Sequence, residues 1–133
     1  MRIAADTNLL VRTVLDDDPE QSRLAIATLG AAETVAVTLP VLCEFVWVLS
    51  RAYKRKPHAI AAAIRQLIAS ASVQIDRPAV EAGLVLLDAG GDFADGVIAF
   101  EGRRLGSDVF VSFDADAVKR LKASGTQALL LSA

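Results

Sequence analysis

The chain has 133 residues, of which 53% are hydrophobic and 23% charged. These values indicate one globular domain over residues 1–133 and exclude an intrinsically disordered protein. The net charge of -2 at pH 7 gives no global attraction for nucleic acid, so any such binding would need local basic patches. The single cysteine, Cys43, excludes a disulfide within the chain and suits the cytoplasm. No apolar run is long enough to span a membrane, so we expect no membrane partner.

Short apolar segments alternate with segments of helical periodicity along the whole chain. In order, the pattern predicts a strand at 2–5, helices at 7–15 and 19–29, a strand at 34–38, helices at 39–53 and 57–70, a strand at 72–75, helices at 78–91 and 92–106, a strand at 108–113, a helix at 114–125 and a strand at 127–131. The second helix is expected to begin after the N-cap Asp18 and to end at Gly30. This alternation is typical of an α/β protein with a parallel sheet covered on both faces.

Two aspartates stand where a strand ends and a helix begins. Asp6 follows the strand at 2–5, and Asp114 follows the strand at 108–113. Either residue can be a plain N-cap, which is a common use of aspartate at such a junction. Ligands of parallel sheets, however, bind at the carboxyl ends of the strands. If the two strands are neighbours, these carboxylates lie close together at that edge.

Glu44 lies in the middle of a predicted apolar helix. One interpretation is a narrow solvent-facing stripe, because Pro40, Glu44, Trp47 and Arg51 share one face by helical spacing. The other is a site that pairs its charge, because a carboxylate is rarely buried unless it is paired or bound to a metal. The sequence leaves both interpretations open.

Asp92 and Asp95 are three residues apart at the start of a later helix. A capping arrangement explains Asp92 fully. It explains Asp95 less well, because the next residues, Val97 and Ile98, direct that turn toward the core.

The acids as a set suit a hard cation. The chain has one histidine, His58, which stands in a basic turn, and one cysteine, so a zinc site is not indicated. Carboxylate oxygens instead suit Mg²⁺ or Mn²⁺. Such an ion lowers the pKa of a bound water and stabilises the charge of a phosphodiester in the transition state.

Four segments of the chain, in order, resemble the motifs of the PIN-domain family: DTNLLVR, LPVLCEFVWVL, DFADGVIA and VSFDADAV. With the acidic segment DDDPEQ and the small size, the chain also resembles the toxin subunits of VapBC-type toxin–antitoxin pairs. The resemblance implies a three-layer α/β/α domain with a central parallel sheet of four to five short strands. It also implies Mg²⁺- or Mn²⁺-dependent cleavage of RNA, with attack of an activated water in line on phosphorus.

The same resemblance assigns roles to individual residues. It implies that the catalytic and metal-binding acids are Asp6, Glu44, Asp95 and Asp114. Asn8 matches a position that helps to orient the first aspartate and the water. Ser112 replaces the more usual threonine and keeps its hydroxyl group. Asp92 and Asp116 match acids that are often present but less central.

Basic residues are needed to guide RNA to an acidic site. The candidates are Arg12, Arg51, Lys54, Arg55, Lys56, Arg103 and Arg104. Arg12 is close to Asp6 in sequence and can contact either RNA or an acid. A further group, Lys119, Arg120 and Lys122, is better explained as solvated residues that suit the C-terminal half of a helix.

A surplus of apolar side chains predicts protein partners. The helices at 39–53 and 57–70 carry more apolar residues than one face can hide, including Val41, Trp47, Val48 and Tyr53. Such a surplus commonly marks an interface. Together with the resemblance, it implies a symmetric homodimer and a small antitoxin. A basic antitoxin side chain near the acids would compete with the metal.

Three other functions fit parts of this pattern. A response-regulator receiver needs an acidic pair after the first strand and a lysine after a late strand, and the chain has neither. A haloacid-dehalogenase-type phosphatase needs an aspartate at the position of Asn8. A PIN-like module that binds RNA or protein without catalysis stays open, because only an activity assay distinguishes it.

Overall fold

The computed structural model describes residues 1–132, which divide into two compact units. The first unit ends at Asp76 and the second begins at Arg77. Each unit combines parallel strands with helices. Among the described residues, no helix is both long enough and apolar enough to cross a membrane.

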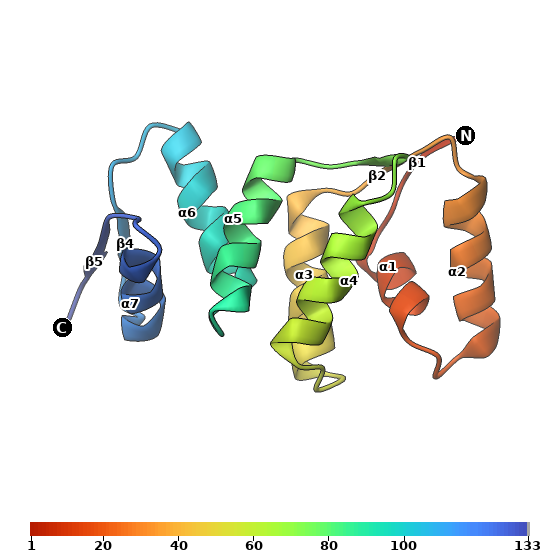
Figure 1. Cartoon of the computed structure of the whole chain (residues 1–133), viewed down its shortest axis with the longest axis horizontal. Coiled ribbons are helices and arrows are strands. Elements are labelled where there is room, and N and C mark those ends of the chain that lie inside the picture. Colours follow the sequence, from red (N-terminus) through yellow and green to blue (C-terminus); the bar gives the residue numbers. More distant parts are fainter. Residues whose placement is uncertain (133) are drawn as a thin grey trace. The chain divides into compact units, whose positions relative to one another are not determined.

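The first unit, residues 1–76, contains three parallel strands and four helices (Figure 1). The strands β1 (Arg2–Ala4), β2 (Thr34–Ala36) and β3 (Val73–Gln74) pair in that order. The helices α1 (Thr7–Val14) and α2 (Pro19–Ala31) connect β1 to β2, and α3 (Leu39–Arg51) and α4 (Pro57–Ile68) connect β2 to β3. Helices α1 and α3 therefore begin just after the carboxyl ends of β1 and β2.

The apolar stripes of these helices are buried as their spacing predicts. Leu42 and Leu49 of α3 and Ile60 and Ile64 of α4 are at most 2% exposed. Val35, on the central strand β2, is 1% exposed. Burial of an apolar side chain of this size contributes roughly 1.5–3 kcal/mol. This core holds the start of α1 and the start of α3 in place.

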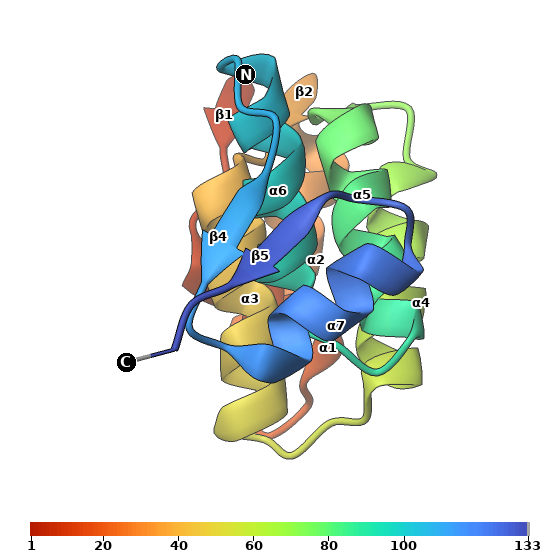
Figure 2. The ribbon, with the colours of Figure 1, turned by 90° about the vertical axis from the view of Figure 1, so that its left-hand side faces the viewer.

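The described part of the second unit contains the helices α5 (Arg77–Asp88), α6 (Phe93–Arg104) and α7 (Ala115–Ala123) and the strands β4 (Phe110–Ser112) and β5 (Ala128–Leu130). The two strands are parallel, and α7, which connects them, packs against both (Figure 2). Leu86, Val118 and Leu121 are buried at the centre of this unit. The chain thus turns from β4 into α7 at the carboxyl end of a parallel strand.

Helices α5 and α6 approach closely because each carries a glycine at their contact. A Cβ at Gly83 would lie 2.6 Å from the ring of Phe93, and a Cβ at Gly96 would lie 2.4 Å from the carbonyl oxygen of Ala82. A glycine inside a helix costs about 1 kcal/mol relative to alanine. The close approach compensates for this cost, because it buries the Phe93 ring completely.

The predicted α/β class and the parallel pairing of the strands are confirmed, and the five strands form one sheet of three and one of two within the described residues. The N-cap at Asp18 is also confirmed, because the backbone N–H of Gln21 donates to Asp18 Oδ1 at 3.1 Å. The prediction that α2 ends at Gly30 is wrong, because the helix continues to Ala31. Gly30 thus lies inside α2, whereas Gly90 lies after the end of α5 and has a positive φ of 87°.

Candidate active site

Asp6 lies at the start of α1, where the sequence places it. The backbone N–H of Leu9 donates to Asp6 Oδ1 at 2.8 Å, so the capping role of Asp6 is confirmed. The residue is exposed, and Oδ2 accepts no hydrogen bond from residues 1–132. The cap therefore fixes the carboxylate through one oxygen and leaves the other for a ligand.

Asp6, Asn8 and Glu44 line one hollow of about 430 Å³ in the first unit. The polar residues come from the start of α1 and the middle of α3, and the rest of the wall includes Val11, Val41 and Val48. Glu44 is exposed, so the interpretation of a solvent-facing stripe is the correct one for its helix face. The structure nevertheless brings Glu44 to the same hollow as Asp6, although 38 positions separate them in the sequence.

Asp114 lies between β4 and α7 in the second unit. Its Oδ1 accepts hydrogen bonds from the backbone N–H groups of Asp116 at 3.0 Å and Ala117 at 3.1 Å. The backbone N–H of Asp114 itself donates to Ser112 Oγ at 2.9 Å. The Ser112 hydroxyl thus fixes the turn that carries Asp114. A threonine at this position would carry the same hydroxyl group and could accept the same hydrogen bond.

Asp92 and Asp95 lie on the first turn of α6, and the structure separates their roles. Asp92 is the N-cap, because Ala94 N–H donates to its Oδ1 at 3.0 Å. Asp95 makes no capping bond and is half-buried. Burial raises the pKa of Asp95 from 3.8 to about 6, and repulsion from Asp92, Asp114 and Asp116 adds to the shift. These four residues, Asp92, Asp95, Asp114 and Asp116, are called the acidic cluster below.

The donor set of the acidic cluster fits a partly hydrated Mg²⁺ or Mn²⁺. Among residues 1–132, no group of three or more Asp, Glu, His or Cys side chains stands close enough to hold an ion alone. Mg²⁺ does not require such a cage, because it usually keeps several waters and takes one or two carboxylates. A cation would also relieve the repulsion that raises the pKa of Asp95.

Arg12 contacts an acid, which is one of its two predicted roles. Its guanidinium donates to Asp17 Oδ1 at 2.8 Å and to the Tyr53 hydroxyl at 3.1 Å, and its side chain is only 11% exposed. Nε of Arg12 is a buried nitrogen without a partner in the described part of the chain. This geometry does not present Arg12 to RNA; it ties α1 to the turn after α3.

The other basic candidates are exposed. Arg51, Lys54, Arg55 and Lys56 stand at the turn between α3 and α4, where Lys54 has a φ of 54°. Arg103 is exposed near the end of α6, whereas Arg104 pairs with Glu101 at 3.5 Å and lies over the ring of Phe100. The turn therefore offers the densest group of exposed cations in the first unit.

The sequence interpretation missed Arg120, which it treated as solvated. Arg120 Nε donates to Asp116 Oδ2 at 2.9 Å, and Nη1 donates to the carbonyl oxygen of Ala89. The spacing of four residues from Asp116 to Arg120 on a helix was a usable signal for the ion pair. The bond to Ala89 joins positions 31 residues apart and has no local signal.

Comparison with known proteins gives the family. The model of the PIN domain matches residues 3–123, a range that contains every acid described above. No curated protein matches the chain. The chain belongs to the PIN domain family. PIN domains have a nuclease-type fold and typically use divalent metal ions.

Proposed function

We propose that this protein is a Mg²⁺- or Mn²⁺-dependent endoribonuclease and the toxin of a toxin–antitoxin pair that acts in the cytoplasm. One observation carries the metal-dependent chemistry. Asp95 is a half-buried carboxylate that caps no helix and faces three other carboxylates. The negative charge of Asp95 therefore opposes folding. Asp92 and Asp114, in contrast, have a structural role as the N-caps of α6 and α7. A strongly perturbed acid without a structural role is typical of a functional site.

We assign metal binding and catalysis to Asp6 and Glu44 and to Asp95 and Asp114. A bound ion would supply activation of water and neutralisation of the phosphodiester charge. Backbone N–H groups at the starts of α1 and α7 hold two of the proposed ligands, Asp6 and Asp114, in place. The caps at Asp6 and Asp114 use Oδ1 of each carboxylate, and Asn8 stands exposed on the first turn of α1, two residues after Asp6.

Asp92, Asp116 and Ser112 support this set in the second unit. Asp92 and Asp116 add negative charge to the acidic cluster, which raises its attraction for a divalent ion. Ser112 holds the backbone of Asp114 through its hydroxyl group. Its replacement should therefore alter the placement of Asp114 without removing a charge.

The exposed basic turn after α3 supports RNA as the substrate. Arg51 is seven residues after Glu44 on the same helix, which is a rise of about 10 Å. The turn then adds Lys54, Arg55 and Lys56, all exposed. Phosphates that contact these cations would guide an RNA strand along α3 toward the hollow that Glu44 lines. Arg103 offers a further exposed cation on α6.

We also propose a homodimer and a small antitoxin as partners. Trp47 on α3 is 61% exposed and Tyr53 in the turn after α3 is 37% exposed, which supports an interface on this part of the first unit. An antitoxin segment with a basic side chain fits the hollow of Asp6 and Glu44, because a cation there pairs with the carboxylates and competes with the metal. Replacement of that basic side chain should weaken inhibition.

Incubation of the purified protein with total RNA tests the proposed function. Cleavage is expected with Mg²⁺ or Mn²⁺ and not with EDTA. Mapping of the cut ends should give 5′-phosphate and 3′-hydroxyl groups. RNA that binds without being cut under all three conditions would contradict the enzyme and favour a non-catalytic PIN-like module.

A further inference from the structure

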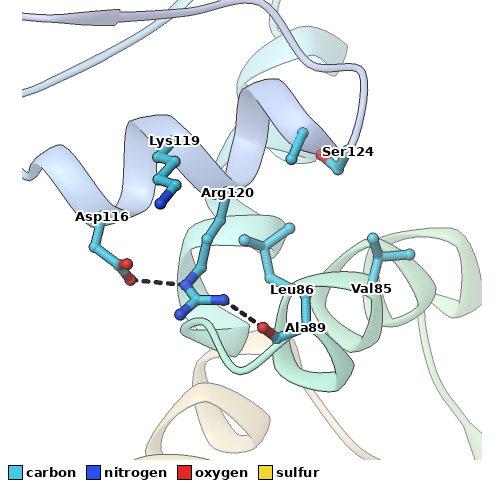
Figure 3. A pocket seen from close by; sticks show the side chains of 8 residues that line it. Val85, Leu86, Ala89, Asp116, Lys119, Arg120 and Ser124 are labelled. Carbon is cyan, nitrogen blue, oxygen red and sulfur yellow. Dashed lines mark hydrogen bonds and ion pairs between the residues drawn. The ribbon is translucent and has the colours of Figure 1, made fainter.

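Arg120 connects the first turn of α7 to the turn between α5 and α6. Both segments lie next to aspartates of the acidic cluster. Arg120 lies on α7 and is half-buried, and its guanidinium reaches the turn between α5 and α6 (Figure 3). Nε donates to Asp116 Oδ2 at 2.9 Å, and Nη1 donates to the carbonyl oxygen of Ala89. One planar group therefore holds a carboxylate and a backbone carbonyl in fixed directions.

The two partners of Arg120 lie close to the metal ligands in sequence. Asp116 is on the first turn of α7, two residues after Asp114. Ala89 follows the end of α5, and only Gly90 and Gly91 separate it from Asp92, the N-cap of α6. The bridge thus joins the segment of Asp114 and Asp116 to the segment of Asp92 and Asp95.

The turn between α5 and α6 is shaped to accept the arginine. Gly91 N–H donates to the Leu86 carbonyl at 2.7 Å, and Gly90 has a positive φ of 87°. A Cβ at Gly91 would lie 2.5 Å from Cδ of Arg120 and 3.1 Å from the Leu86 carbonyl oxygen. The arginine stem lies along a hollow of about 330 Å³ whose walls include Val85 and Leu86 (Figure 3).

We propose that Arg120 is a positioning residue that sets the spacing between the two halves of the acidic cluster and so sets its metal affinity. This inference rests on the proposed function. A solvated cation at the end of a helix would need no glycine turn and no second partner. A lysine cannot replace the arginine fully, because an ammonium group lacks the fork that donates in two fixed directions.

Calorimetric titration of the metal-free protein with MnCl₂ tests the proposal, together with steady-state cleavage of an RNA. Arg120→Lys should weaken Mn²⁺ binding about 10-fold and lower kcat about 10- to 100-fold, the usual effect of losing a partner that orients metal ligands. The KM for RNA should change less than about threefold, because Arg120 orients the ligands and does not bind the substrate. Gly91→Ala, which displaces the arginine stem without removing a charge, should act in the same direction.

The matched control is Lys119→Gln, which removes an exposed positive charge from the neighbouring position of α7. It should leave Mn²⁺ affinity and kcat within about twofold. A wild-type protein that binds Mn²⁺ and cleaves RNA, with Arg120→Lys unchanged in both, would overturn this inference alone. A wild-type protein that neither binds Mn²⁺ nor cleaves RNA would overturn the proposed function and this inference with it.

Backbone amide NMR gives a readout that needs no metal. Arg120→Gln should shift the amide signals of Asp92 and Asp95, because the bond to Ala89 holds the turn that precedes them. Unchanged Asp92 and Asp95 signals in a folded Arg120→Gln protein would overturn the bridge itself.

Discussion

Asp95→Asn should stabilise the metal-free protein at pH 7, although the residue is assigned to catalysis. The fold raises the pKa of Asp95 from 3.8 to about 6, mainly by burial and then by repulsion within the acidic cluster. The folded protein therefore holds the Asp95 proton more tightly than the unfolded chain does. Asparagine has nearly the same shape and carries no charge, so it removes this cost.

The magnitude follows from the pKa difference. A shift of one pKa unit corresponds to about 1.4 kcal/mol, so the full shift sets an upper bound of about 3 kcal/mol. Asp95 is only half-buried, so solvent screening reduces the bound to roughly 1–2 kcal/mol. The N-terminus of α6 favours a carboxylate by about 0.3–1 kcal/mol, which asparagine loses. The net gain in the free energy of unfolding is therefore about 1 kcal/mol.

The sign of the pH dependence follows from the same shift. Between pH 3.8 and about 6 the folded state binds a proton at Asp95 that the unfolded state has released. The contribution of Asp95 to stability is therefore greatest below pH 3.8 and is lost as the pH rises through 6. The advantage of Asp95→Asn should accordingly be present at pH 7 and vanish near pH 4.

Urea denaturation in EDTA, at pH 7 and near pH 4, measures these differences. The matched control is Asp92→Asn, which removes a charge from the same helix start but keeps a good N-cap residue. It should change stability at pH 7 by less than Asp95→Asn does. An Asp95→Asn protein that is equally stable or less stable than the wild type at pH 7 in EDTA would refute the reasoning.

Three further predictions concern packing, the turn before α7 and the metal. Gly96→Ala should lower the free energy of unfolding by roughly 2 kcal/mol, because the added Cβ would clash with the carbonyl of Ala82. Gly30→Ala should raise the free energy of unfolding by about 0.5–1 kcal/mol, because Gly30 lies in a helix with open space around it. Equal urea midpoints for the two variants would contradict the packing of α5 on α6. Ser112→Ala should cost about 1 kcal/mol and Ser112→Thr much less, because only the hydroxyl accepts from Asp114 N–H; thermal melts that rank the two variants alike would contradict this role. Mn²⁺ at about 100 times its Kd should stabilise the wild type by about 2.7 kcal/mol, and EDTA should reverse the effect; an unchanged Tm at millimolar Mn²⁺ would count against the metal site.

The sequence predicts the features that local chemistry determines. The caps at Asp6, Asp18 and Asp114 follow from aspartate directly before a helix, and each is present. The helical periodicity likewise predicts the buried face of α3. The four motifs predict the family because their order and spacing are specific, and the family match confirms it.

The features that the sequence does not predict depend on contacts between distant segments. Asp95 lies on α6, which packs closely on α5 through Gly83 and Gly96. From the sequence alone, these glycines only lower the predicted stability of their helices and give no sign of the contact. Helical spacing alone does not decide whether Glu44 faces solvent or is buried with a partner, and the structure shows that it is exposed. The bond from Arg120 to Ala89 depends on the packing of α7 beside the turn after α5.

The central claim is that the acids serve metal-dependent RNA cleavage as well as helix capping. The most direct measurement compares the initial rates of Mg²⁺-dependent RNA cleavage of Asp6→Asn, Asp114→Asn and Asp18→Asn. All three aspartates are N-caps, and asparagine keeps the cap in each, so the three variants should be about equally stable. Asp6→Asn and Asp114→Asn should lose most of the activity, while Asp18→Asn should cleave RNA at the wild-type rate. Equal rates for wild type and all three variants would contradict the central claim.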